Sequence, residues 1–175
     1  MRGSFVYATE HIQPKIIAEI GVASGDNALE MLMHYPVEYM LLADCYLPYT
    51  DSANHEVLTI EKQNKKLLET LYKVMPRGFL NKIVFSCMTS EKISQYYPDK
   101  FFDYVYIDAR HDYDNVKRDI SLWYNKVKDG GVLGGHDYQG YYDGVTRAVN
   151  EFKEKHANEL SFIQGSEYDW AFHKK

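Results

Sequence analysis

The chain has 175 residues, of which 45% are hydrophobic and 26% are charged, and this balance is typical of one globular domain rather than a disordered or fibrous protein. Lys and Arg total 20 against 25 Asp and Glu, so the net charge of −5 argues against a nucleic-acid partner. No apolar run approaches the roughly 20 residues of a membrane span, and the first residues lack the apolar stretch of a secretory signal. We therefore expect a cytoplasmic protein with no membrane partner.

Strand-like and helix-like segments alternate along the chain. A β-branched run at Lys15–Ile20 predicts the first strand, and Asn27 and Glu30 have the spacing of an N-cap and its N3 partner in a following helix that ends at Pro36. Further strands are predicted at residues 39–44, 82–87, 102–108, 132–134, 160–164 and 168–173. Further helices are predicted at residues 55–75, 90–98, 116–128 and 145–152.

This alternation predicts an α/β fold, in which crossover helices cover both faces of one parallel sheet. Residues 1–175 are expected to form a single domain with a minimal N-terminal cap, because only about 14 residues precede the first strand. Ligands of such sheets bind at the carboxyl ends of the strands. Polar residues do follow the strands here, at Glu19–Asn27, Asp44, Met88–Ser90, Asp108–Asp112 and Gly135–Tyr138.

The turn after the first strand has the features of a nucleoside site. Gly21 and Gly25 allow a ligand close to the backbone, and the helix that follows offers free N–H groups. Asp44 follows Gly25 by 19 residues, close to the spacing expected for an acid that binds ribose hydroxyls. The turn and the acid together predict a ligand that contains a nucleoside.

The residues around this turn favour S-adenosylmethionine over a dinucleotide. Ala23 and Ala28 occupy positions where a dinucleotide site has glycines, and Asp26 stands where a phosphate needs a donor. Glu19 also repels phosphate, but it suits an ammonium group. An NAD(P)-dependent oxidoreductase remains the alternative enzyme.

Three segments resemble methyltransferase family 24, a group of small bacterial-type class I S-adenosylmethionine-dependent O-methyltransferases. The segments are Ala18–Asn27, Phe102–Tyr113 and Gly130–Tyr138. The resemblance implies a Rossmann-like, doubly wound sheet of seven strands, mostly parallel, with an antiparallel C-terminal hairpin. It implies that Glu19, Gly21 and Gly25 hold the methionine end of the cofactor and that Asp44 binds the ribose. Met88 or Thr89 would contact the adenine.

The full set of residues expected to bind the cofactor comes from the first four loops. It comprises Glu19, Gly21, Val22, Ala23, Gly25, Asn27, Asp44, Cys45, Met88, Thr89 and Asp108.

The last two loops carry the candidate catalytic groups. Asp108 and Asp137 follow adjacent strands, and two carboxylates suit Mg²⁺ or another divalent cation. His111 is a candidate general base, because an ordinary histidine pKa is about 6.5. In related sugar O-methyltransferases an acid stands at the position of His136. Two alternatives therefore remain open: a metal bound by Asp108, His136 and Asp137, or catalysis without a metal. The expected catalytic set is His111, Asp108 and His136.

The methyl acceptor is expected to be a sugar or another small molecule with a hydroxyl group. Two groups of tyrosines fall on loops at the same sheet edge and are predicted to form the wall of the acceptor site. They are Tyr46 and Tyr49 in the first group, and Tyr138, Tyr141 and Tyr142 in the second. The alternative of another class is a cofactor-binding module or partner subunit without activity. A homo-oligomer, in which a second copy completes the site, is also left open.

Overall fold

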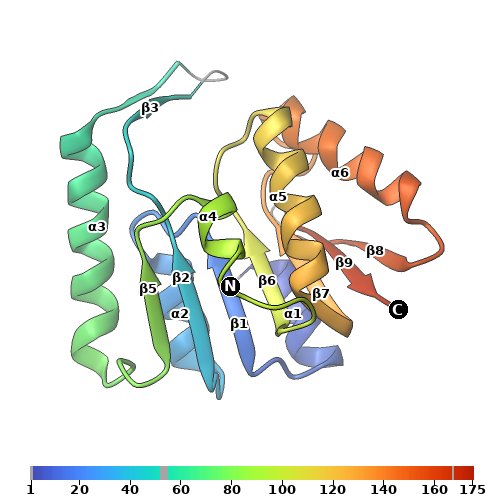
Figure 1. The fold of residues 1–175 in the computed structure, drawn as a ribbon, viewed down its shortest axis with the longest axis horizontal. Coiled ribbons are helices and arrows are strands. Elements are labelled where there is room, and N and C mark those ends of the chain that lie inside the picture. The colour runs from blue at the N-terminus through green and yellow to red at the C-terminus, as the bar shows by residue number, and fades with distance from the viewer. Residues whose placement is uncertain (1, 52–54, 167) are drawn as a thin grey trace.

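A computed structural model describes residues 2–51, 55–166 and 168–175, so five residues of the predicted domain lie outside this description. Its main sheet has seven strands in the order β5-β2-β1-β6-β7-β9-β8 (Figure 1). The strands are β1 Ile16–Ile20, β2 Tyr39–Ala43, β5 Ile83–Ser86, β6 Phe102–Ile107, β7 Val127–Gly135, β8 Leu160–Gln164 and β9 Trp170–Lys174. The first five run parallel, and β9 is antiparallel to both β7 and β8. This is the predicted sheet.

Helices cover both faces of the sheet. They are α1 Gly3–His11, α2 Asp26–His34, α3 Ile60–Val74, α4 Ser90–Ser94, α5 Tyr113–Lys126 and α6 Asp143–Lys155. One core packs α4, α5 and α6 against one face, and a second core packs α1, α2 and the end of α3 against the other. The central strands are buried on both faces, which explains why they read as continuous apolar runs. In the described parts of the chain, no helix is long and apolar enough to cross a bilayer.

Three local features differ from the prediction. Residues 3–11 form a helix, α1, that was not predicted. Helix α3 begins at Ile60 instead of residue 55, because a short antiparallel ribbon, β3 Tyr49–Thr50 and β4 Val57–Leu58, precedes it. The predicted cap at Asn27 is wrong: α2 begins at Asp26 with Gly25 as its N-cap, so Asn27 lies inside the helix and its side chain is used elsewhere.

Candidate cofactor and catalytic site

A cavity of about 430 Å³ opens at the carboxyl ends of β1, β2 and β6. Most of the residues predicted to bind the cofactor line it. These are Glu19, Gly21, Val22, Ala23, Asn27, Asp44, Cys45, Met88 and Asp108. The two that do not line it have structural roles. Gly25 caps α2 and packs against Thr70, and the Thr89 side chain caps α4. The topological rule that ligand sites follow the strands therefore located this cavity correctly.

Gly21 fixes the first turn against the end of β6. Its φ of +89° lies in the region that favours glycine, and a Cβ at this position would stand 2.1 Å from the carbonyl oxygen of Asp108. No side chain fits there. Because Gly21 has no side chain, the turn after β1 can lie directly against Asp108 at the end of β6. These two segments form adjoining walls of the cavity.

Asp44 organises the same turn. One carboxylate oxygen accepts hydrogen bonds from the backbone N–H groups of Val22 (3.0 Å) and Ala23 (2.9 Å). The other oxygen accepts from the N–H of Tyr46 at 2.9 Å. The carboxylate is thus held in one orientation at the cavity wall, and its unused lone pairs remain available for further donors.

Glu19 is a buried acid with incomplete hydrogen bonding. Only 2% of the residue is exposed, and its Oε1 accepts a hydrogen bond from Nδ2 of Asn27 at 2.9 Å. Among the residues that the structure describes, neither Oε2 of Glu19 nor Oδ1 of Asn27 has a hydrogen-bond partner. Burial raises the pKa of Glu19 to about 8. Two unsatisfied buried acceptors beside a cavity call for a donor from a ligand.

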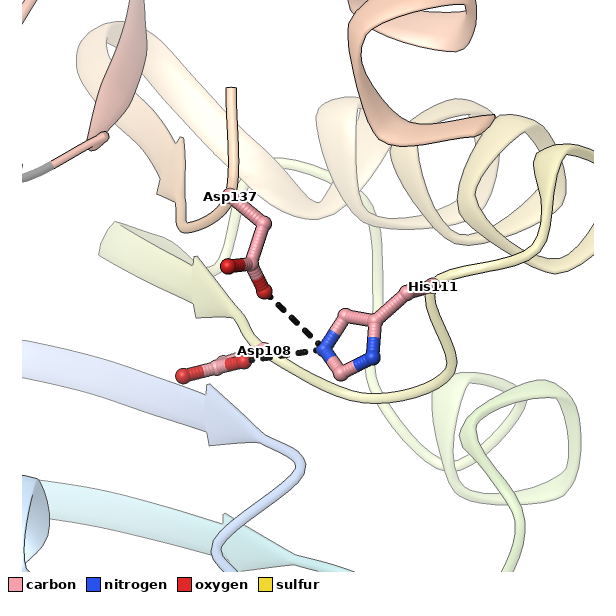
Figure 2. A group of neighbouring side chains, drawn as sticks. All are labelled: Asp108, His111 and Asp137. Atoms are coloured by element: carbon pink, nitrogen blue, oxygen red, sulfur yellow. Dashed lines mark hydrogen bonds and ion pairs between the residues drawn. The ribbon is translucent and has the colours of Figure 1, made fainter. Parts of the chain in front are cut away.

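His111 lies between two carboxylates at the edge of the cavity (Figure 2). Its Nε2 is 3.1 Å from Oδ2 of Asp137 and 3.4 Å from Oδ1 of Asp108. Its Nδ1 is 3.6 Å from Oδ2 of Asp51, and its ring stacks on that of Tyr142. Burial alone lowers the pKa of His111, but the contact with Asp108 and the three carboxylate charges outweigh burial, so the pKa is raised.

His136 stands beside this group and not within it. Its Nδ1 is 3.2 Å from Oδ1 of Asp137. In the described ranges of the chain, the group whose ligand atoms all lie within 4.8 Å of one another comprises Asp108, His111 and Asp137. His111 thus takes the position predicted for His136. The backbone of Asp137 has a φ of 65°, a left-handed conformation that the sequence spacing does not indicate.

The predicted tyrosine wall is only partly present. Tyr46 and Tyr138 are buried, and their hydroxyls donate to the carbonyl of Ala23 and to Oδ1 of Asn150, so both act in packing. Tyr49 lines the cavity, and Tyr142 covers His111. Tyr141 is 70% exposed. Arg2 also lines the cavity, although it lies outside every motif of the sequence and was not predicted there.

Comparison with known families identifies the class of protein. A profile of methyltransferase family 24, described as a methyltransferase domain, matches residues 18–138. The chain belongs to this family. The match spans the turn at Gly21 and the loops that carry Asp108, His111 and Asp137, and it confirms the resemblance seen in the sequence. A comparison with curated proteins gives no significant match.

Solved structures share the fold of this family 24 chain at low sequence identity. The O-methyltransferase NovP is 16% identical, with a TM-score of 0.71 over 97% of this chain and 77% of NovP. TomG, an O-methyltransferase of Streptomyces achromogenes solved with S-adenosylmethionine (SAM), is 13% identical, with a TM-score of 0.66 over 98% and 78%. Spermidine synthase of Thermotoga maritima is 18% identical, with a TM-score of 0.60 over 99% of this chain, which spans 60% of that protein.

Proposed function

We propose that this methyltransferase uses SAM to methylate a hydroxyl group of a sugar or another small molecule. One observation carries the proposal: the cavity lined by Glu19 and Asp44 ends at a histidine held between two carboxylates. The first part of this arrangement suits a cationic nucleoside, and the second suits the removal of a proton from a hydroxyl. The O-methyltransferases NovP and TomG, which share the fold, support the same chemistry.

The acidic lining of the cavity matches SAM. The cofactor carries a positive sulfonium and an α-ammonium group and has no phosphate, so the carboxylates of Glu19 and Asp44 attract it. In the proposed complex, the free acceptors of Glu19 and Asn27 receive the ammonium N–H groups. Asp44 binds the ribose hydroxyls, and Met88 contacts the adenine. A dinucleotide would place its pyrophosphate against the same acids, so the oxidoreductase alternative is disfavoured.

Nε2 of His111 is the proposed proton acceptor. As it takes the proton of the acceptor hydroxyl, the oxygen attacks the methyl carbon in line with the sulfonium. The new C–O bond then forms while the S–CH₃ bond breaks, and the sulfide leaves as S-adenosylhomocysteine. Asp108 and Asp137 stabilise the imidazolium that results, because each lies within 3.4 Å of Nε2.

The same three side chains could instead hold a divalent cation. Two carboxylate oxygens and one imidazole nitrogen suit Mn²⁺, Fe²⁺ or Zn²⁺ better than Mg²⁺, which prefers oxygen ligands. A bound ion would lower the pKa of the acceptor hydroxyl. Nε2 of His111 cannot bind an ion and accept a proton at once, so the metal-assisted and the histidine-based reactions exclude each other at this residue.

A methyl-transfer screen tests the proposal. Purified chain and SAM are incubated with a panel of sugars and phenols, with and without a chelator, and the formation of S-adenosylhomocysteine is measured. We expect Asp108→Asn to lower turnover at least 100-fold while cofactor binding is retained. Methylation of amines or thiols but of no hydroxyl would contradict O-methylation. Activity that survives the chelator assigns His111 as base, whereas activity restored by Mn²⁺ assigns the metal.

A further inference from the structure

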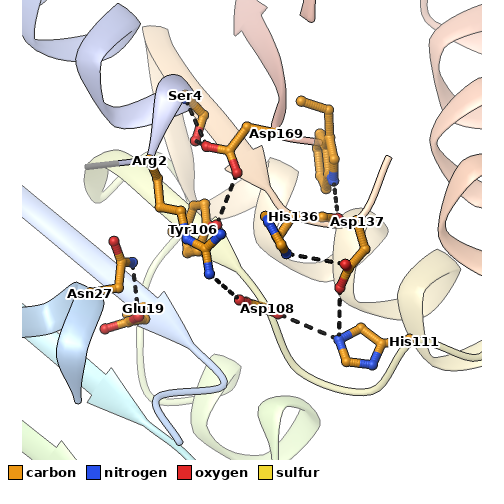
Figure 3. Close-up of polar contacts among 11 residues, drawn as sticks. Arg2, Ser4, Glu19, Asn27, Tyr106, Asp108, His111, His136, Asp137 and Asp169 are labelled. Carbon is orange, nitrogen blue, oxygen red and sulfur yellow. Dashed lines mark hydrogen bonds and ion pairs between the residues drawn. The ribbon is translucent and has the colours of Figure 1, made fainter. Parts of the chain in front are cut away.

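The N-terminal segment brings a cation into the cofactor cavity. Arg2 directly precedes α1 and lines the same cavity as Glu19 and Asn27 (Figure 3). Its Nη2 lies 3.4 Å from Oδ2 of Asp108, and 28% of its side chain is exposed. Burial works against its charge, but Tyr106 and the surrounding carboxylates outweigh burial and raise the pKa of Arg2. The guanidinium is therefore a fixed positive charge in the cavity that Glu19 and Asp108 also line.

A buried set of hydrogen bonds holds this cation in place. Oδ2 of Asp169 accepts from both the backbone N–H and the hydroxyl of Ser4, each at 2.9 Å. Oδ1 of Asp169 accepts from the hydroxyl of Tyr106 at 3.1 Å, and the Ser4 hydroxyl also bonds that of Tyr104. Asp169 is fully buried, so these bonds are shielded from water. We call Ser4, Tyr104, Tyr106 and Asp169 the α1 latch; it fixes the residue that follows Arg2 by only two positions.

The contact with Asp108 engages only part of the hydrogen-bonding capacity of the Arg2 guanidinium. A strong hydrogen bond between a guanidinium and a carboxylate is about 2.7–2.9 Å long, so the 3.4 Å contact is a loose one. A guanidinium has five N–H groups in a fixed planar fork. The other cations that line the cavity lie elsewhere: Lys66 comes from α3, and Arg110 lies over the ring of Tyr49. Of these three cations, Arg2 is the one whose charge acts on Glu19, where it favours the ionised carboxylate and works to lower its pKa.

An amino-acid zwitterion needs acceptors for its ammonium group and a cation for its carboxylate. The methionyl group of SAM carries an ammonium and a carboxylate on the same carbon atom. The free oxygens of Glu19 and Asn27 suit the ammonium, but they repel the carboxylate. The carboxylate needs a donor next to them. A planar guanidinium can bind it through two parallel hydrogen bonds.

We propose that Arg2 binds the α-carboxylate of the methionyl group of SAM, and that the α1 latch positions it for this purpose. The proposal rests on the proposed function, since it assumes that SAM occupies the cavity. It makes the N-terminus of α1 a part of the cofactor site. It also predicts that the site binds SAM more tightly than an analogue of SAM that lacks the carboxylate.

Three ligands separate this proposal from the proposed function. Titration calorimetry is done with SAM, with decarboxylated SAM, which keeps the amine and the sulfonium, and with methylthioadenosine, which lacks the whole amino-acid group. We expect the native chain to bind SAM about 10- to 100-fold more tightly than decarboxylated SAM. Arg2→Met should remove most of this difference by weakening SAM alone, and Arg2→Lys should restore part of it.

Controls show whether a loss is specific. Lys15→Met removes another N-terminal cation, one that pairs with Glu38 outside the cavity, and should change no affinity. Unchanged binding of methylthioadenosine by Arg2→Met shows that the cavity remains intact. An Arg2→Met variant that keeps the preference for SAM, or that binds all three ligands more weakly by the same factor, overturns the role of Arg2. A native chain that binds neither SAM nor methylthioadenosine overturns the proposed function itself.

Discussion

At the level of single residues, the carboxylates around His111 raise its pKa, and this pKa sets the pH dependence of turnover. A general base must be neutral to accept a proton, so turnover should rise with pH through the pKa of His111. Three carboxylates hold this pKa above its usual value of 6.5. Asp137→Asn removes the nearest charge without removing volume. The acid limb of the kcat profile should then move to lower pH by about 0.5–1 unit.

This shift is measured from initial rates between about pH 5 and 9. Asp99→Asn is the matched control, because Asp99 is an exposed acid that pairs with Lys126 and precedes β6, whereas His111 follows the other end of that strand. It should leave the profile unchanged. A limb that stays in place in Asp137→Asn would show that His111 is not the group that titrates.

The raised pKa of Glu19 predicts that cofactor affinity depends on pH. A cationic ligand binds the ionised form, and with a pKa of about 8 only a minor fraction of Glu19 is ionised at neutral pH in the unliganded protein. The affinity for SAM should therefore increase roughly tenfold between about pH 6.5 and 8. Glu19→Gln should flatten this rise and weaken binding at the upper end. Titrations at several pH values measure both effects, and an equally steep rise in Glu19→Gln would contradict the role of Glu19.

Most of the individual site residues could be predicted because topology places them. Glu19, Asp44 and Asp108 each end or follow a parallel strand, and such residues meet at one edge of the sheet. The exchange of His136 for His111 could not be predicted, because sequence spacing does not show which of the two histidines contacts both carboxylates. Arg2 could not be predicted either, since only the packing of α1 brings it to the cavity.

At the level of secondary structure, helices and strands were predictable where their own sequence supports them. The central strands are β-branched or apolar runs, and α5 and α6 repeat apolar residues at helical spacing. α1 has nine residues, which is too short to be stable alone, so its formation depends on tertiary contacts. The two-residue strands β3 and β4 likewise show no period that a sequence could reveal.

The packing of Phe5 predicts how strongly α1 contributes to stability. Phe5 is 1% exposed and contacts the rings of Tyr35 and Tyr104. Phe5→Ala should lower the free energy of unfolding by about 3–4 kcal/mol, because it leaves a cavity between α1 and the sheet. Urea denaturation measures the loss. Tyr96→Ala, at a position that is 71% exposed, should change stability by less than about 0.5 kcal/mol. A loss below about 1 kcal/mol for Phe5→Ala would mean that α1 is not firmly docked.

At the level of the whole molecule, several buried groups make stability depend on pH in the same direction. Burial raises the pKa of Glu19 to about 8 and that of Asp119 to about 6. The pKa values of His111 and His136 are also raised, because neighbouring carboxylates outweigh the burial that would lower them. Each of these groups binds its proton more tightly in the folded chain than in the unfolded chain, so each favours folding at low pH.

The stabilisation by each group is complete below its unfolded pKa and is lost as pH rises through its folded pKa. For Glu19 this window runs from 4.5 to about 8, and for Asp119 from 3.8 to about 6. The stabilisation by His111 and His136 is complete below pH 6.5 and is lost as the pH rises through their raised pKa values. We therefore expect the unliganded protein to lose on the order of 2–4 kcal/mol of unfolding free energy between about pH 5 and 8. Urea titrations across this range measure the loss.

SAM should reverse part of this pH dependence, because a cation bound beside Glu19 stabilises the ionised carboxylate. At a SAM concentration 100 times the Kd, binding adds about 2.7 kcal/mol to the free energy of unfolding. Because the affinity for SAM rises with pH, a fixed SAM concentration should stabilise the protein more at pH 8 than at pH 6. Glu19→Gln should make the unliganded protein more stable at pH 8, since it removes the buried charge, and should reduce the gain from SAM. A stability that rises between pH 5 and 8 without ligand would contradict the proton affinities assigned to these buried groups.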